Sequence, residues 1–117
     1  MEYLFGGCYS LTSLNISNFN TQNVHNMHSM FSDCYSLTSL DISNFNIQNI
    51  ENMDYMFHNC FSLTFIDITS FSIPNTTSFS MLHLFSSLKN CTIKVKRNYL
   101  TYIQNQIHSN LILDIID

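Results

Sequence analysis

Three cysteines recur at a fixed interval and are the first candidates for chemistry in this sequence. Cys8, Cys34 and Cys60 are evenly spaced along the chain. If equivalent positions stack about 4.8 Å apart in neighbouring parallel strands, their Cα separation suits a disulfide, but their parallel Cβ directions oppose one. Three thiols in one column also cannot all pair, and no CxxC motif supports zinc. We therefore predict reduced, inward-facing thiols and no metal site.

The other reactive residue types lack a catalytic or ligand-binding context. His25 and His28 have an HxxH spacing, and Glu51 and Asp54 take the same places one cysteine interval later. Such a mixed set ligates a metal only if further contacts fix the imidazole rings, which an exposed turn does not provide. Ser, His and Asp all occur, but no GxSxG-like nucleophile motif is present. We expect exposed histidines, no enzyme activity and no cofactor.

A 26-residue repeat contains all of these positions and constrains the fold. Segments 8–19 and 34–45 read CYSLTSLNISNF and CYSLTSLDISNF, and a third copy from residue 60 reads CFSLTFIDITSF. One such unit is too short to bury its own apolar residues. We therefore predict that neighbouring copies stack on one another with their strands in parallel.

A fourth copy is predicted to be one residue shorter than the others. In this alignment Met81 is equivalent to Met56, and Cys91 is equivalent to Ile66. Both intervals fall one residue short of the cysteine interval. Cys91 therefore takes a Leu/Ile position, and Phe85 takes the place of the repeated cysteine.

Each copy combines two short elements whose apolar spacings differ. The segment LxxLxI at residues 37–42 ends in an alternation of period 2, which predicts a short strand. After Asn49, apolar residues follow at i, i+3 and i+7 from Ile50 to Phe57. This spacing predicts a short helix or 3₁₀ turn, with Asn49 as its N-cap.

The full pattern of one copy resembles a known repeat family. Residues 30–53 read MFxxCxSLTSLDIxNFNxxNIxNM, which resembles the BspA-like leucine-rich repeats of microbial surface proteins. The resemblance extends from residue 1 to about residue 95. It implies an α/β repeat: a leucine-rich-repeat-type solenoid with a parallel β-sheet on the concave side and short helical turns on the convex side. Where an Asn ladder is usual in leucine-rich repeats, this sequence has phenylalanines, so we expect stacked aromatic rings there.

The same resemblance implies a non-catalytic function. It points to a cell-surface or secreted adhesion module that contacts a protein of a host or neighbouring cell. An intracellular leucine-rich-repeat scaffold is the alternative interpretation, because the thiols are predicted to be unpaired. The segment Met1 to Phe5 aligns with Met53 to Phe57, so we expect further repeats of the same protein upstream.

Two regions are predicted along the chain. Residues 1–96 form a repeat array of about 3.5 repeats that starts mid-repeat, and residues 97–117 form a C-terminal cap. Asn98 precedes an expected helix with an apolar face, and residues 111–116 form an expected final strand. Lys94 and Lys96 in the last repeat strand are interpreted as protection against edge pairing.

The strand pattern predicts which side chains face the core and which face a partner. Three columns form the expected core ladder: Cys8, Cys34 and Cys60; Leu11, Leu37 and Leu63; Phe19, Phe45 and Phe71. The alternate residues face the concave surface and are the expected binding residues: Ser13, Asn15, Ser17, Ser39, Asp41, Ser43, Phe65, Asp67 and Thr69. Phe65 stands where Ser13 and Ser39 occur and is the candidate anchor, because aromatic residues dominate interface hot spots.

Composition narrows the class of partner. Only 10% of the 117 residues are charged, and the net charge is −4. All four basic residues lie between Lys89 and Arg97, so residues 1–88 contain none. Such a surface lacks the basic patch that nucleic-acid binding requires, so we expect no nucleic-acid partner. No apolar run approaches the roughly 20 residues of a membrane helix, so we expect no membrane span.

Overall fold

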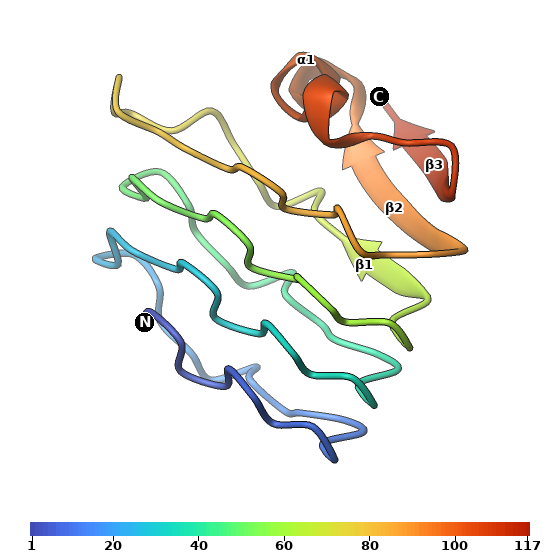
Figure 1. Ribbon diagram of the computed structural model, residues 1–117. Coiled ribbons are helices and arrows are strands. Elements are labelled where there is room, and N and C mark those ends of the chain that lie inside the picture. Colours follow the sequence, from blue (N-terminus) through green and yellow to red (C-terminus); the bar gives the residue numbers. More distant parts are fainter.

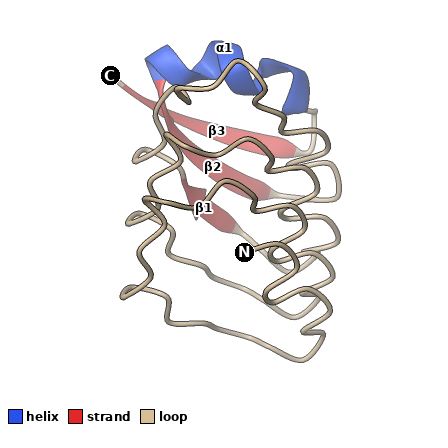
Figure 2. Ribbon diagram, turned by 90° about the vertical axis from the view of Figure 1, so that its left-hand side faces the viewer, coloured by secondary structure: helices blue, strands red, loops and turns tan.

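The computed structural model describes residues 1–117 and contains one three-stranded parallel sheet and one short helical segment (Figure 1). The strands follow the order β1-β2-β3 in the sheet: β1 (Phe65–Asp67), β2 (Cys91–Lys96) and β3 (Leu111–Ile116). The helical segment consists of three short helices: η1 (Arg97–Tyr99), α1 (Leu100–Ile103) and η2 (Gln104–Gln106). Figure 2 shows this segment at the β3 end of the molecule. None of these helices has the length and apolar character needed to cross a membrane.

Successive copies of the repeat lie side by side (Figure 1), and backbone hydrogen bonds join them. The Phe5 N–H donates to the Met30 carbonyl at 2.9 Å, and the Phe31 N–H donates to the Met56 carbonyl at 3.0 Å. These bonds repeat because equivalent residues of neighbouring copies lie directly beside one another. The predicted stacking of successive copies is therefore present in the structure.

Regular strands are fewer than the repeat pattern predicts. Of the first three copies, only the third has a strand within its LxxLxI segment, namely β1, while the first two have no strand assignment there. Thr38 N–H donates to the Thr12 carbonyl at 3.1 Å, and Thr64 N–H donates to the Thr38 carbonyl at 3.5 Å. Such sparse bonds hold neighbouring copies together without completing a strand ladder.

The predicted helical turn after Asn49 is wrong, because the segment forms consecutive turns instead. Tyr55 and Asn59 have φ angles of 58° and 60°, which lie in the left-handed region and interrupt a right-handed helix. The Tyr55 N–H donates to the Leu82 carbonyl of the next copy at 2.9 Å. Asn49 caps no helix, and its side-chain amide donates to the Gln22 carbonyl at 2.8 Å.

The third and fourth copies are 28 residues apart at the Asn52–Ser80 bridge and 27 apart at the Asp67–Lys94 strand pair, so the predicted shortening of the fourth copy is wrong. Asn26 bridges to Asn52, and Asn52 bridges to Ser80, so the second interval exceeds the first. The extra residues lie before Ser80, because nine positions separate Phe71 from Ser80 and only seven separate Phe45 from Asn52. Leu, Ile and Met are interchangeable in an apolar pattern, so the sequence alignment was ambiguous here.

This longer spacing changes the place of Phe85. The Phe85 ring stacks on the Phe57 ring with 6.2 Å between centroids and 7° between planes, so it continues a phenylalanine column. Leu88 takes the cysteine position, since its N–H donates to the Phe85 carbonyl as the Cys60 N–H does to Phe57. Cys91 still occupies a buried apolar position. The prediction that Phe85 replaces the repeated cysteine is therefore wrong.

The stacked aromatic column lies at a different position from the one predicted. The rings of Phe5, Phe31 and Phe57 stack in sequence, with centroids 5.6 and 5.9 Å apart. Phe45 and Phe71 are buried but share no ring contact, and Phe71 meets Tyr99 edge to face instead. The expectation of stacked rings at the Asn-ladder position is therefore wrong.

The expected core ladder lies in the interior of the stack. Its members in the second and third copies are buried: Cys34, Cys60, Leu37, Leu63, Phe45 and Phe71. The first-copy members are half-buried: Cys8, Leu11 and Phe19. This gradient follows from packing, because within the 117 residues the first copy has a neighbour on one side only.

The C-terminal strand has the bounds that the sequence predicts. The helix α1 is shorter than the helix predicted after Asn98. β3 pairs in parallel with β2, with Cys91 opposite Leu111 and Lys94 opposite Asp114. β2 is therefore an inner strand, and the interpretation of Lys94 and Lys96 as edge protection is wrong. Lys94 instead places its Nζ 3.6 Å from Asp67 Oδ2 on β1.

Candidate binding site on the sheet face

A hollow of about 530 Å³ lies across three neighbouring copies of the repeat. Nine residues line it: Ser13, Leu14, Asn15, Ser39, Leu40, Asp41, Ser43, Phe65 and Asp67. Seven of them are expected binding residues, so stacking brings most of the predicted set together. Ser17 and Thr69 do not line the hollow, and sequence reasoning missed Leu14 and Leu40, whose apolar positions predict burial alone.

Phe65 supplies the large apolar surface at this hollow. Its side chain is 43% exposed on β1, between the buried residues Leu63 and Ile66. In the two preceding copies the same position holds Ser13 and Ser39, so the ring stands beside two small hydroxyl side chains. The aromatic ring therefore breaks an otherwise small and polar surface.

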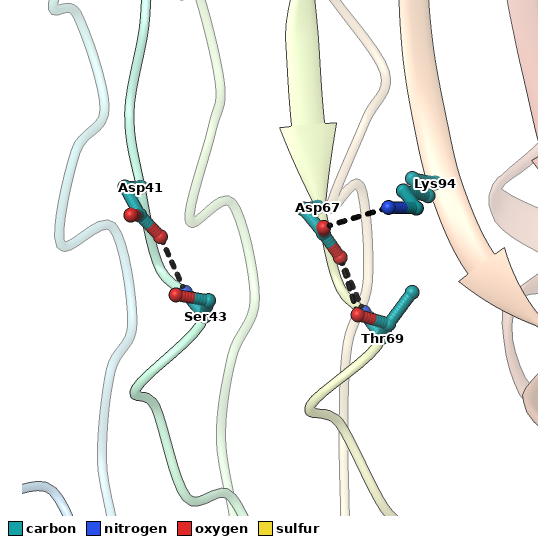
Figure 3. Close-up of polar contacts among 5 residues, drawn as sticks. All are labelled: Asp41, Ser43, Asp67, Thr69 and Lys94. Carbon is teal, nitrogen blue, oxygen red and sulfur yellow. Dashed lines mark hydrogen bonds and ion pairs between the residues drawn. The ribbon is translucent and has the colours of Figure 1, made fainter.

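The polar residues of the hollow also hold the turn that follows each strand segment (Figure 3). Asp41 Oδ1 accepts the Ser43 N–H at 2.9 Å. Asp67 Oδ1 accepts both the N–H of Thr69 at 2.9 Å and its hydroxyl at 2.6 Å. These are Asx turns, in which a short carboxylate or amide takes the place of a backbone acceptor.

The first copy makes the same turn with an amide. Asn15 Oδ1 accepts the Ser17 N–H at 3.1 Å and its hydroxyl at 2.7 Å. The signal for these turns is the pattern Asn/Asp-x-Ser/Thr, which sequence reasoning interpreted as a binding ladder only. Ser17 and Thr69 therefore orient their acidic or amide neighbours and do not line the hollow themselves.

The two aspartates give this surface its negative charge. Hydrogen bonds from the Ser43 hydroxyl and N–H lower the pKa of Asp41 below its ordinary value. Partial burial raises the pKa of Asp67. The hydrogen bonds from Thr69 and the nearby Lys94 ammonium together lower it by more, so its pKa lies below the ordinary value. Both carboxylates are therefore ionised at neutral pH.

Cys8, Cys34 and Cys60 form a column separate from this hollow, and Cys91 is buried at another position. All four are free thiols, and the Sγ atoms of Cys34 and Cys60 donate to the carbonyls of Phe5 and Phe31 at 3.2 and 3.1 Å. Burial, with a smaller contribution from neighbouring thiols, raises the pKa of Cys34 to about 11 and that of Cys60 to about 12. Thiols of this kind are poor nucleophiles and pack as small apolar groups.

The two histidines of the HxxH motif lie in different environments. His25 is exposed, whereas His28 is half-buried, with its ring 5.8 Å from the ring of Tyr55 and 5.9 Å from that of Tyr3. No group of three His, Cys, Asp or Glu side chains is arranged to hold a metal ion. The hollow on the sheet face is therefore the leading candidate site.

Comparison with known families places this chain among proteins of unknown function. The model of a family described as Mycoplasma protein of unknown function, DUF285, matches residues 1–98. The chain belongs to the DUF285 family. The matched region of this DUF285 chain contains all nine expected binding residues as well as β1 and β2. No curated protein and no solved structure matches the chain.

Proposed function

We propose that this DUF285 chain is a non-catalytic protein-binding module, built as a leucine-rich-repeat-type solenoid of the BspA-like kind. The observation that carries the proposal is the hollow on the sheet face, which three neighbouring copies build together. Solenoid proteins bind partners on extended concave surfaces of this sort. Further repeats of the same protein would extend the surface beyond the three copies.

Phe65 is the proposed anchor of the binding surface. An exposed ring beside ionised carboxylates and small hydroxyls resembles the centre of a protein interface, where aromatic residues contribute most of the affinity. The surrounding Ser13, Ser39 and Ser43 supply donors and acceptors for backbone or side-chain groups of a partner. Asp41 and Asp67 are held in place by their own turns, so little ordering is required on binding.

The surface suits binding better than catalysis. The Oδ1 atoms of Asp41 and Asp67 already accept hydrogen bonds, and no histidine or cysteine lines the hollow. A nucleophile and a base within hydrogen-bond reach are the usual requirements for acyl or phosphoryl transfer. By the BspA-like resemblance, the proposed partner is a protein on a host or neighbouring cell, and the proposed location is the cell surface or the secreted fraction.

An adhesion assay with matched variants tests this function. Beads coated with the chain should adhere to cultured epithelial cells or to cells of the source organism, and protease treatment of those cells should abolish adherence. Phe65→Ser, which installs the residue of the other two copies, should reduce adherence at least about fivefold, because it removes the aromatic anchor. Phe61→Ser is the control, since Phe61 is 52% exposed but does not line the hollow.

Two results would contradict the proposed function. Equal adherence of coated and uncoated beads to both cell types would contradict the proposed binding activity. Equal losses of adherence for Phe65→Ser and Phe61→Ser would show that binding does not depend on the hollow.

An intracellular scaffold is the second candidate, and the four free thiols favour it, because unpaired cysteines are typical of reducing compartments. Protease added to intact cells distinguishes the two locations. Loss of the protein from intact cells supports the surface, whereas protection until lysis supports the scaffold.

A further inference from the structure

Strand β3 has a hydrogen-bonded neighbour on one side only. The sheet order β1-β2-β3 places β2 on one side of it, and residues 112–117 make no backbone hydrogen bond outside the sheet. The strand reads Leu-Ile-Leu-Asp-Ile-Ile, with no Pro, Gly or Lys. Natural edge strands are usually protected by such residues or by a covering element. The outer edge of β3 therefore offers unpaired N–H and C=O groups for another strand.

The charges on one face of the sheet indicate which strand would fit. Asp67, Lys94 and Asp114 are opposite one another on β1, β2 and β3, so their signs alternate across the sheet. Lys94 Nζ lies 3.6 Å from Asp67 Oδ2. The next position in this row, beyond Asp114, favours a basic residue, because opposite charges on neighbouring strands stabilise pairing. Ile112, in the adjacent row on the same face, is 56% exposed and favours an apolar neighbour.

The opposite face of β3 has room for an apolar side chain. A hollow of about 320 Å³ lies between the helical segment and β3, lined by Leu100, Thr101, Gln104, Ile107 and Leu113. Leu113 faces away from Asp114, since neighbouring residues of a strand point to opposite faces. A strand added at the edge would therefore place an apolar residue beside Leu113 and a basic residue beside Asp114.

We propose that the free edge of β3 is a docking site for an extended segment of another protein, which adds as a fourth strand with one basic residue among apolar ones. A second copy of this chain fits less well. Antiparallel pairing of two β3 strands places the two Asp114 carboxylates opposite each other or at neighbouring positions, and like charges there destabilise pairing. The site is separate from the hollow on the sheet face, so the two proposals fail or stand independently.

Hydrogen exchange of the whole chain with two synthetic peptides tests the proposal. Both peptides alternate Thr and Val in a palindrome, so that parallel and antiparallel docking present the same side chains. One has a central Lys, and the other has a central Glu. The Lys peptide should slow exchange of β3 amides and should bind about fivefold more tightly than the Glu peptide, as expected for a cross-strand charge pair.

Charge-swap variants show whether Asp114 determines the preference. Asp114→Lys should reverse it, so that the Glu peptide binds more tightly. Glu51→Lys makes the same change of charge at an exposed residue outside the sheet and should leave the preference unchanged. Three results would overturn the proposal: β3 amides that neither peptide protects, equal binding of both peptides in every variant, or β3 protection that rises with protein concentration alone and so indicates a second copy at the edge.

Discussion

Replacing Leu37 with alanine tests whether stacked copies supply the stability of this chain. Leu37 is 0% exposed and lies in the second copy, between Leu11 of the first and Leu63 of the third. Its equivalent Leu11 is only half-buried. The same substitution at the two positions therefore removes the same atoms from environments that differ in burial.

The expected loss follows from the atoms removed. Leu→Ala deletes three carbon atoms, each worth about 0.8 kcal/mol when buried, and leaves a cavity that adds to the cost. For Leu37 the free energy of unfolding should fall by about 2–5 kcal/mol, the range for fully buried leucines. For Leu11 we expect roughly half of that, because part of its side chain remains in water.

Urea unfolding of the two variants and the unchanged chain measures these losses, with the slope of the transition showing whether the cooperative unit has changed. A loss below about 0.5 kcal/mol for Leu37→Ala would refute the packing of this column. An equal loss for Leu11→Ala would show that burial in the stack does not set the cost.

Two further predictions concern titratable groups. The raised pKa values of Cys34 and Cys60 mean that these thiols ionise more readily in the unfolded chain, so the free energy of unfolding should fall as the pH rises from 9.0 towards about 12. Denaturant unfolding across this pH range should show a smaller decline for Cys60→Ala. An equal decline in the variant and the unchanged chain would contradict the burial of the thiol. Asp67→Ala should cost about 1–2 kcal/mol by removing the acceptor of the Thr69 bonds, whereas Asp67→Asn should cost less than about 0.5 kcal/mol, since Asn15 makes the same turn. Because the pKa of Asp67 is lowered, its charge-dependent stabilisation should disappear below pH 3.8 in the unchanged chain but not in Asp67→Asn, and equal pH profiles would contradict the assigned role.

The spacing of apolar residues predicted the stack of copies and the face that each residue occupies. Leu37 and Leu63 recur with the repeat and are buried, while Ser39 and Asp41 alternate with apolar residues and are exposed on the sheet face. Such positions are predictable because stacked copies must present the same side to their neighbours. The bounds of β3 were predictable for a similar reason, since all of its residues except Asp114 are apolar and three of them are isoleucine, which favours strands.

Local geometry within each copy was not predictable from that spacing. Ile50, Met53 and Phe57 are equally compatible with a helical turn and with consecutive tight turns, because both bring every third or fourth residue to one side. The choice depends on where the intervening N–H groups find acceptors. Tyr55 N–H finds the Leu82 carbonyl of the next copy, a partner that no single copy contains.

The sequence by itself determined the period of the repeat, the buried columns and the grouping of polar residues on one face, because these follow from the order of apolar and polar residues along the chain. Tertiary structure alone decided the alignment of the fourth copy, the inner position of β2 and the open edge of β3. In each case the deciding contact joins distant residues, such as Phe57 with Phe85 or Lys94 with Asp114. Apolar residues substitute for one another in a pattern, so only their partners in space show which residue is equivalent to which.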